Sequence, residues 1–260
     1  MVMDVRFAYT GIRVTQLERA LDFYAGLGLK VAERGVMSHG GVFVLLEDPR
    51  TGQRLELNWY PPTSPFNTPY TVGEALDHLG YGVEDARRSF HELVSRGAEP
   101  ALEPWSERDG VSLAYIKDPD GIWIELFSSV KTTQLGLEYV GIRVTDLGRA
   151  LRLYRDTMGL LESGRGTMSH GGVWVDLLDP WTMQKLELNW YPRGSRFDWA
   201  YEPGEALDHL GLTTERFDED LERLREAGCE LKLKPWLEGD TMIAFLEGTD
   251  GVWLELESKQ

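Results

Sequence analysis

The chain contains an internal duplication, which constrains its fold more than any other feature of its sequence. Residues 55–61 read LELNWYP, and residues 186–192 repeat the same seven letters. Residues 73–80 (GEALDHLG) return unchanged as residues 204–211, so both pairs are 131 residues apart, about half of the 260-residue chain. A tandem repeat of this length predicts two copies of one domain, each near the commonest domain size.

Each half shows one order of elements twice: a strand, a helix and three further strands. Thr15 is expected to cap the first helix, because Glu18 three residues later completes a capping box. Asp85 is expected to cap the second helix, and Gly97 to end it. The expected strands of the first half are residues 7–14, 29–34, 41–46, 54–59, 78–83, 99–103, 112–117 and 122–127, and the second half repeats them between residues 137 and 257, with helices near 146–158 and 217–227.

The chain is therefore predicted to be an α+β protein of four βαβββ modules, with domains at residues 1–130 and 134–260 and a linker at 128–136. One module offers a four-stranded sheet with only one face covered by a helix. Its other face must pair with a second module, which leaves a cleft between curved mixed sheets. The sequence leaves open which modules pair.

Charge and composition exclude several classes of partner. The chain has 27 basic and 43 acidic residues, a net charge of -16, which repels nucleic acid and anionic membrane surfaces. It shows neither a secretory signal nor an apolar run long enough to span a membrane. Cys229 is the only cysteine, which fits a reducing compartment. We therefore expect a cytoplasmic protein that acts on a small molecule.

The repeated motifs place charged side chains inside apolar strand patterns. Glu56 and Glu187 each lie between two leucines, and His78 and His209 each follow 22 residues later. Alternation in a strand directs Glu56 away from the leucines, toward a cleft or toward solvent. Because unpaired polar groups are costly in a strand core, each pair suggests a shared ligand.

These motifs, together with TGIRV at residues 10–14 and DPDGIWIE at residues 118–125, resemble the vicinal oxygen chelate superfamily. That superfamily includes glyoxalase I, bleomycin resistance proteins and extradiol dioxygenases, and the motifs are most similar to glyoxalase I. The resemblance covers nearly the whole chain. It implies two glyoxalase-like domains, a fused pair of subunit-like halves, and it also allows a homodimer.

The resemblance implies a divalent metal ion (Ni, Co, Mn, Zn or Fe) held by residues from separate strands. The matching positions are Glu56, His78 and Glu125 in the first half and Glu187, His209 and Glu255 in the second. If the halves exchange modules, Glu56 instead joins His209 and Glu255. The first ligand position of the family, usually His or Gln, falls on Tyr9 and Tyr139, which are poor ligands near their ordinary pKa and are expected to line the substrate site.

A glyoxalase I reaction, of the lyase or isomerase class, moves a proton next to a carbonyl through a metal-bound enediolate. The resemblance assigns this proton transfer to the glutamates Glu56, Glu125, Glu187 and Glu255. Arg13 and Arg143 match one position that anchors glutathione in the family, but Ala75 and Val111 replace other basic residues. We therefore expect a small oxo-carbonyl substrate other than glutathione itself.

Two alternatives remain at this point. An extradiol ring-cleaving dioxygenase is the first, although each matching site has one His where that iron chemistry favours two. A metal-free protein that binds a planar small molecule is the second.

Several repeated residues are open to two interpretations. His39 and His170 either cap a turn or lie at the mouth of the cleft as replacement ligands or acid–base groups. Trp59 and Trp190 are candidates for lining an aromatic substrate pocket. Arg13 and Arg143 are either anion anchors in the cleft or half-exposed strand charges.

Overall fold

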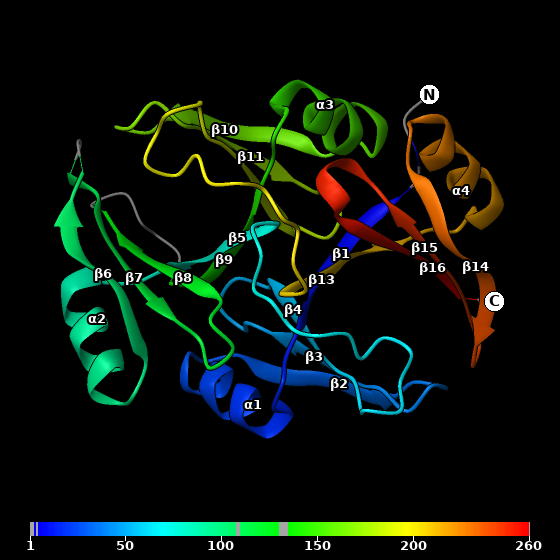
Figure 1. Cartoon of the computed structure of the whole chain (residues 1–260), viewed down its shortest axis with the longest axis horizontal. Coiled ribbons are helices and arrows are strands. Elements are labelled where there is room, and N and C mark those ends of the chain that lie inside the picture. Colours follow the sequence, from blue (N-terminus) through cyan, green and yellow to red (C-terminus); the bar gives the residue numbers. More distant parts are fainter. Residues whose placement is uncertain (1–2, 4, 108–109, 130–134, 260) are drawn as a thin grey trace.

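The structure is a computed structural model that describes residues 3, 5–107, 110–129 and 135–259. The expected linker at 128–136 lies partly outside these residues. The described helices and strands repeat the βαβββ order four times (Figure 1). Module 1 consists of β1 (Arg6–Arg13), α1 (Leu17–Gly26), β2 (Lys30–Val36), β3 (Val42–Glu47) and β4 (Arg54–Trp59), and module 2 of β5 (Leu76–Gly82), α2 (Ala86–Ser95), β6 (Glu99–Ser106), β7 (Ser112–Lys117) and β8 (Trp123–Ser128).

Modules 3 and 4 repeat this order with two short additions. Module 3 consists of β9 (Gly136–Arg143), α3 (Leu147–Leu151), the π-helix Arg152–Thr157, β10 (Leu161–Thr167), β11 (Val173–Leu178) and β12 (Lys185–Trp190). Module 4 consists of β13 (Leu207–Thr213), α4 (Phe217–Glu226), β14 (Glu230–Glu238), β15 (Thr241–Glu247), the 3-10 turn Thr249–Gly251 and β16 (Trp253–Lys259). The helix expected at 146–158 is thus present, but its second part is a π-helix.

The modules pair across the two halves of the sequence. One eight-stranded sheet, the first sheet, has the order β14-β15-β16-β13-β1-β4-β3-β2 and joins modules 1 and 4. The second sheet, β10-β11-β12-β9-β5-β8-β7-β6, joins modules 2 and 3. This settles the choice that the sequence left open in favour of exchange. It also corrects the expected face-to-face pairing, because the modules join edge to edge through the antiparallel pairs β1–β13 and β5–β9.

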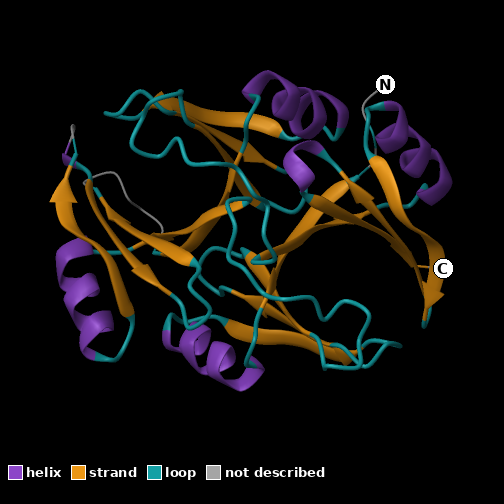
Figure 2. Cartoon of the chain, in the orientation of Figure 1, coloured by secondary structure: helices purple, strands orange, loops and turns teal. Residues whose placement is uncertain are grey.

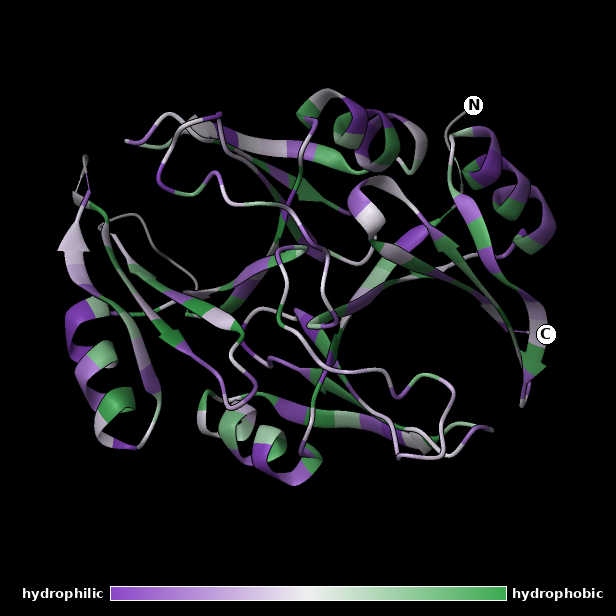
Figure 3. Cartoon of the chain, in the orientation of Figure 1, coloured by the Kyte–Doolittle hydropathy of each residue, from purple (hydrophilic) through white to green (hydrophobic). Residues whose placement is uncertain are grey.

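The helices lie at the periphery of the molecule, and the sheets lie between them (Figure 2). Hydrophilic and hydrophobic residues alternate along the strands (Figure 3). In β4, Leu55 and Leu57 are fully buried in the core under α1, whereas Glu56 points to the other face of the sheet. The alternation that builds the core therefore also presents the glutamate on the face without a helix.

The capping predictions have different outcomes. The backbone N–H of Arg88 donates to Asp85 Oδ1 at 2.9 Å, which confirms Asp85 as the cap of α2. The prediction for Thr15 is wrong, since Gln16 occupies the cap position of α1 and makes no side-chain cap. Thr15 instead donates from both its backbone N–H and its hydroxyl to Asp120 in module 2. Thr15 thus binds a distant carboxylate instead of the first turn of its own helix.

Several contacts join the sheets, and two of them are repeated in both halves. Gln53 and Gln184, in the β3–β4 and β11–β12 turns, each bind the backbone of the other turn, with Nε2 donating to Met183 O at 2.7 Å and to Gly52 O at 2.8 Å. The segments that link the modules also cross at Gly73 and Gly204. Both glycines have φ near 70°, and a Cβ on either would overlap the backbone of the other segment, so this crossing requires glycine. Among the described residues, no helix is both long and apolar enough to traverse a lipid bilayer.

Candidate metal sites

The first sheet brings Glu56, His209 and Glu255 together, and we call these three residues the first cluster. They lie on β4, β13 and β16, three of the four central strands, and Tyr9 lies on the fourth, β1. Gly11 of β1 stands opposite both Glu56 and His209, which places these two side chains on either side of a residue that has none.

The glycines make room for the rings of the site. A Cβ on Gly11 would lie 2.7 Å from His209 Cε1, so the imidazole lies directly over this glycine. Gly211 of β13 is paired with both Tyr9 and Glu255, and a Cβ there would overlap the Tyr9 ring. The register of β1 against β13 therefore assembles the site.

The ligand atoms of the first cluster converge on one point. One atom from each residue lies within 4.8 Å of the others, and all three side chains are buried, with exposures of 3–8%. His209 Nε2 lies 2.8 Å from Glu255 Oε2 and 3.5 Å from Glu56 Oε1. Both contacts are within ion-pair distance, although neither has the geometry of a hydrogen bond. Two carboxylates and an imidazole nitrogen that converge in this way form a donor set that suits a divalent cation.

Further side chains hold these three in position. His209 Nδ1 lies 2.8 Å from Asp208 Oδ1, which also accepts a hydrogen bond from the Tyr60 hydroxyl at 3.0 Å. Asn58 Nδ2 donates to Glu56 Oε1 at 3.0 Å. Such contacts fix which imidazole nitrogen faces a metal and how its ring is oriented.

Burial determines the electrostatics of the first cluster. It raises the pKa of Glu56, against the opposing effects of His209 and Asn58. Burial alone would lower the pKa of His209, but the negative charge of Glu255 and the close contacts with Asp208, Glu255 and Glu56 raise it well above its ordinary value. The site thus concentrates negative charge that a cation would neutralise.

The second sheet brings together Glu187, His78 and Glu125, and we call these the second cluster. Gly141 and Gly80 occupy the same places in the register as Gly11 and Gly211. His78 Nε2 lies 3.5 Å from Glu187 Oε1, and Nδ1 lies 2.7 Å from Asp77 Oδ1. Both clusters therefore combine one glutamate of the repeated LELNWYP motif with the imidazole and second glutamate of the other half.

The second cluster differs from the first in its tyrosines. The Tyr139 hydroxyl donates to Glu125 Oε1 at 2.9 Å and lies 3.3 Å from His78 Nε2. The Tyr115 hydroxyl donates to Glu125 Oε2. In the first cluster, Tyr9 donates to both Glu255 and Glu257.

The predicted arginines are buried, so they are not half-exposed strand charges. Arg13 donates from its two terminal nitrogens to Thr68 Oγ1 and Thr68 O, both at 2.7 Å, and lies over the Tyr60 ring. Arg143 forms an ion pair with Glu74 at 2.6 Å. Tyr60 connects Arg13 to the first cluster through Asp208.

His39 and His170 lie in turns outside the two clusters. His39 Nδ1 lies 3.0 Å from Ser64 Oγ and accepts from the Gly41 N–H, and His170 Nδ1 accepts from the Gly172 N–H. Burial lowers the pKa of both imidazoles. These contacts match the turn-capping interpretation.

The expectation that Trp59 and Trp190 line the substrate pocket is not met. Each tryptophan lies three residues after its motif glutamate, so it points to the opposite, helix-covered face of the sheet and packs against the core. Trp59 lines a cavity of about 480 Å³ together with residues 15–19 at the start of α1.

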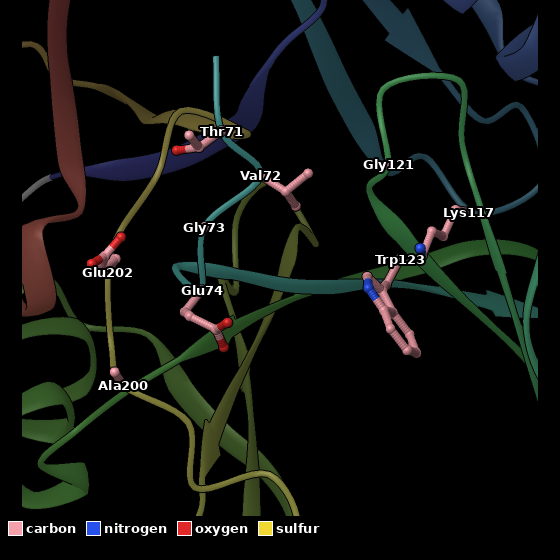
Figure 4. A pocket seen from close by; sticks show the side chains of 9 residues that line it. All are labelled: Thr71, Val72, Gly73, Glu74, Lys117, Gly121, Trp123, Ala200 and Glu202. Carbon is pink, nitrogen blue, oxygen red and sulfur yellow. The ribbon is translucent and has the colours of Figure 1, made fainter. Parts of the chain in front are cut away.

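Another cavity, of about 370 Å³, lies where the two linking segments cross. Figure 4 shows Thr71, Val72 and Glu74 from one segment and Glu202 from the other, with Trp123 nearby. Neither cavity includes a residue of the two clusters. The geometry of the clusters, rather than the shape of these cavities, identifies the candidate sites.

Sequence reasoning missed several residues that build the sites. Gly11 and Gly141 recur in the same repeated motif, and Asp77 and Asp208 directly precede the two histidines, so the repeat itself contained this signal. Glu257 gave no such signal, because its counterpart in the other half is Phe127.

Comparison with known proteins identifies relatives in sequence and in fold. A model of the Glyoxalase/Bleomycin resistance protein/Dioxygenase superfamily matches residues 6–126 and 136–256. A lactoylglutathione lyase of Arabidopsis thaliana is 26% identical over 160 residues, which is 60% of this chain and only 55% of the relative. The lactoylglutathione lyase of Neisseria meningitidis serogroup B is 31% identical over 46% of this chain and 88% of the relative. The crystal structure of glyoxalase I from Zea mays has the same fold, with a TM-score of 0.80 at 23% identity over 98% of this chain and 92% of that one.

Proposed function

The chain belongs to the glyoxalase/bleomycin resistance protein/dioxygenase superfamily, and from this membership and the first cluster we propose a divalent-metal-dependent enzyme of the glyoxalase I type. It would move a proton next to a carbonyl group in a small oxo-carbonyl substrate. One observation carries this proposal: the buried His209 Nε2 lies 2.8 Å from Glu255 Oε2 and 3.5 Å from Glu56 Oε1, so that three ligand atoms converge on one point.

Glu56, His209 and Glu255 would hold the metal. A divalent ion bound there supplies a Lewis acid that polarises neighbouring substrate oxygens and stabilises negative charge as it develops. Asp208 keeps the imidazole oriented through Nδ1, and the side chain of Tyr9 restrains Glu255.

We assign the proton transfer to Glu56. Its Oε1 accepts from Asn58 at 3.0 Å, and Oε2 has no comparable hydrogen bond among the described residues. Glu255 Oε2, by contrast, accepts from Tyr9 and lies 2.8 Å from His209 Nε2. Glu56 would take a proton from one carbon and return it to the adjacent one.

The substrate is proposed to be an oxo-carbonyl compound without glutathione, although the relatives named above are lactoylglutathione lyases. The net charge of -16 repels a polyanionic adduct. Arg143 is already neutralised by Glu74, whereas Arg13 donates to two neutral groups, Thr68 Oγ1 and Thr68 O. Turnover of an α-oxoaldehyde assayed with and without glutathione distinguishes the two substrates.

A ring-cleaving dioxygenase fits the first cluster less well. Oxygen activation by non-haem iron uses two histidines and one carboxylate, whereas the described residues place one imidazole with two carboxylates here. Oxygen uptake with catechols is the measurement that would favour this alternative.

The proposal is tested with Glu56→Gln, which keeps the size of the side chain and removes its basicity. We expect purified wild-type protein, grown with added metal, to contain bound nickel, cobalt, manganese or zinc by elemental analysis. Glu56→Gln should lose turnover by at least a hundredfold while its thermal melting stays near that of the wild type.

Glu18→Gln is the matched control, because Glu18 is exposed on α1 and loses the same charge. Wild-type protein without metal, or Glu56→Gln with full turnover, would contradict the proposal.

A further inference from the structure

The two clusters descend from one repeated sequence but differ in what binds the second glutamate. We propose that only the first cluster binds a metal ion, and that the hydroxyl of Tyr115 keeps the second cluster metal-free. This inference rests on the proposed metal-binding role of the first cluster. It adds that the chain carries one metal ion and that one hydroxyl group keeps the second cluster from binding another.

The first observation concerns Glu125, the carboxylate that a metal at the second cluster would need. Both of its oxygens are engaged, Oε1 by the Tyr139 hydroxyl and Oε2 by the Tyr115 hydroxyl. Its counterpart Glu255 is bound by one tyrosine, Tyr9, on Oε2 alone. Tyr9 also shares its single hydroxyl proton with Glu257, which weakens its hydrogen bond to Glu255 further.

The second observation concerns the imidazoles. His78 Nε2 has the Tyr139 hydroxyl 3.3 Å away, whereas no tyrosine hydroxyl of the described residues is hydrogen-bonded to His209 Nε2. His209 Nε2 also lies within ion-pair distance of Glu255, while no ion pair is found between the described His78 and Glu125. Within the described part of the chain, only the first cluster has three such ligand atoms within 4.8 Å of one another.

The third observation shows that the hydroxyl, and not the ring, makes this difference. Tyr115 stacks on Trp105 with ring centres 5.9 Å apart and meets His78 edge to face. In the first cluster the equivalent ring belongs to Phe245, which stacks on Trp236 at the same 5.9 Å and meets His209 edge to face. The two rings occupy equivalent places, so exchanging Tyr and Phe should leave the packing unchanged.

A metal ion at the second cluster would have to displace the tyrosine hydroxyls from Glu125. A hydrogen bond to a charged group corresponds to roughly a 10- to 100-fold change in affinity. Losing the Tyr115 bond alone should therefore raise the metal affinity of the second cluster by about this factor.

Asp176 is an alternative metal ligand in the second cluster. It lies opposite Glu187 in the β11–β12 pair, where the first sheet has Leu45 opposite Glu56. If Asp176 served as a replacement ligand for Glu125, the second cluster would bind a metal in spite of Tyr115. The wild-type chain would then bind two ions rather than one.

The test is the number of ions bound by the full chain. After removal of metal with a chelator, the protein is titrated with Co²⁺ and followed by calorimetry and by the absorption of the bound ion. We expect about one ion per wild-type chain, none at that affinity in Glu56→Gln, and about two in Tyr115→Phe.

The reciprocal variant Phe245→Tyr adds the hydroxyl to the first cluster and should weaken its Co²⁺ affinity by about 10- to 100-fold. Thermal melting of both variants checks that the ring exchange preserves the fold.

The possible results distinguish a failure of this inference from a failure of the proposed function. Two ions in the wild type, or one in Tyr115→Phe, would overturn this inference and leave the proposed function standing. A single wild-type ion that is lost in Glu187→Gln but kept in Glu56→Gln would place the metal at the second cluster and overturn the inference as well. No ion in the wild type, even at millimolar Co²⁺, would refute the proposed function itself.

Discussion

Gly11 is the residue whose replacement tests the assembly of the first cluster most directly. It carries no ligand, yet it lies between Glu56 and His209 in the sheet, and the imidazole lies over it. Gly11 is not one of the glycines with positive φ, so alanine fits its backbone without strain. Any effect of Gly11→Ala on metal binding must therefore come from the added methyl group.

The size of this effect follows from the distances. The new Cβ would lie 2.7 Å from His209 Cε1 and 2.9 Å from each ring nitrogen. Favourable contacts between carbon atoms lie at about 3.5–4.0 Å, so the ring would have to shift by about 1 Å. Binding sites lose function when a ligand moves by more than about 0.5 Å. We expect a 10- to 100-fold loss of metal affinity, about 1.4–2.7 kcal/mol.

The assay is a competition titration of the metal-stripped protein with Zn²⁺ against a coloured chelator. Gly141→Ala is the matched control, since its Cβ would lie 3.0 Å from His78 Cε1 in the second cluster. That variant should bind its ion as tightly as the wild type if the metal occupies the first cluster. Wild-type affinity in a folded Gly11→Ala protein would refute the reasoning, because it would mean that the position of His209 over this glycine does not matter.

Three further perturbations test other parts of the structure. Asp208→Asn should lower Zn²⁺ affinity at least tenfold by weakening the partner of the metal-facing imidazole, while Asp77→Asn should not. Gln53→Ala removes two partly buried hydrogen bonds between the sheets and should lower the free energy of unfolding by about 2–3 kcal/mol in urea, whereas the exposed Gln16→Ala should leave it unchanged. Burial raises the pKa of Asp118 to about 6. Because the folded chain then holds this proton more tightly than the unfolded chain, stability should fall by about 0.8 kcal/mol between pH 5.5 and pH 7.5. Asp118→Asn should lack this component, and an identical pH slope in both proteins would contradict it.

The sequence predicted the elements of each module well, because their signals are local. Alternating leucines fixed the face of β4 on which Glu56 lies, and Asp85 capped its helix with a neighbour three residues away. Thr15 carries an equally good local signal, but its backbone N–H and hydroxyl both donate to Asp120 of another module. As an N-cap, the Thr15 oxygen would instead accept a backbone N–H of the helix, and only the tertiary fold shows that a distant carboxylate is present.

The errors at the site have different physical origins. The placement of Trp59 could have been obtained from the sequence, since a residue three positions after Glu56 in a strand must point to the opposite face. The role of Tyr115 could not, because its partner Glu125 lies opposite it on a neighbouring strand whose register the sequence does not fix. The repeated motif already singled out Gly11 in the sequence, but the role of this glycine in the site depends on which strand lies beside β1.

The pairing of modules shows why the candidate sites were predicted only as alternatives. Glu56 and Glu187 occupy identical motifs, so either pairing gives two glutamates and one histidine per site. The two possible pairings differ in the strand that lies beside β1, and in the structure this strand is β13 rather than β5. The reciprocal contacts of Gln53 and Gln184 then hold together two sheets that each contain strands from both halves. Each cluster consequently needs residues from both copies of the repeat, so the first cluster forms only after β1 has met a strand almost 200 residues farther along the chain.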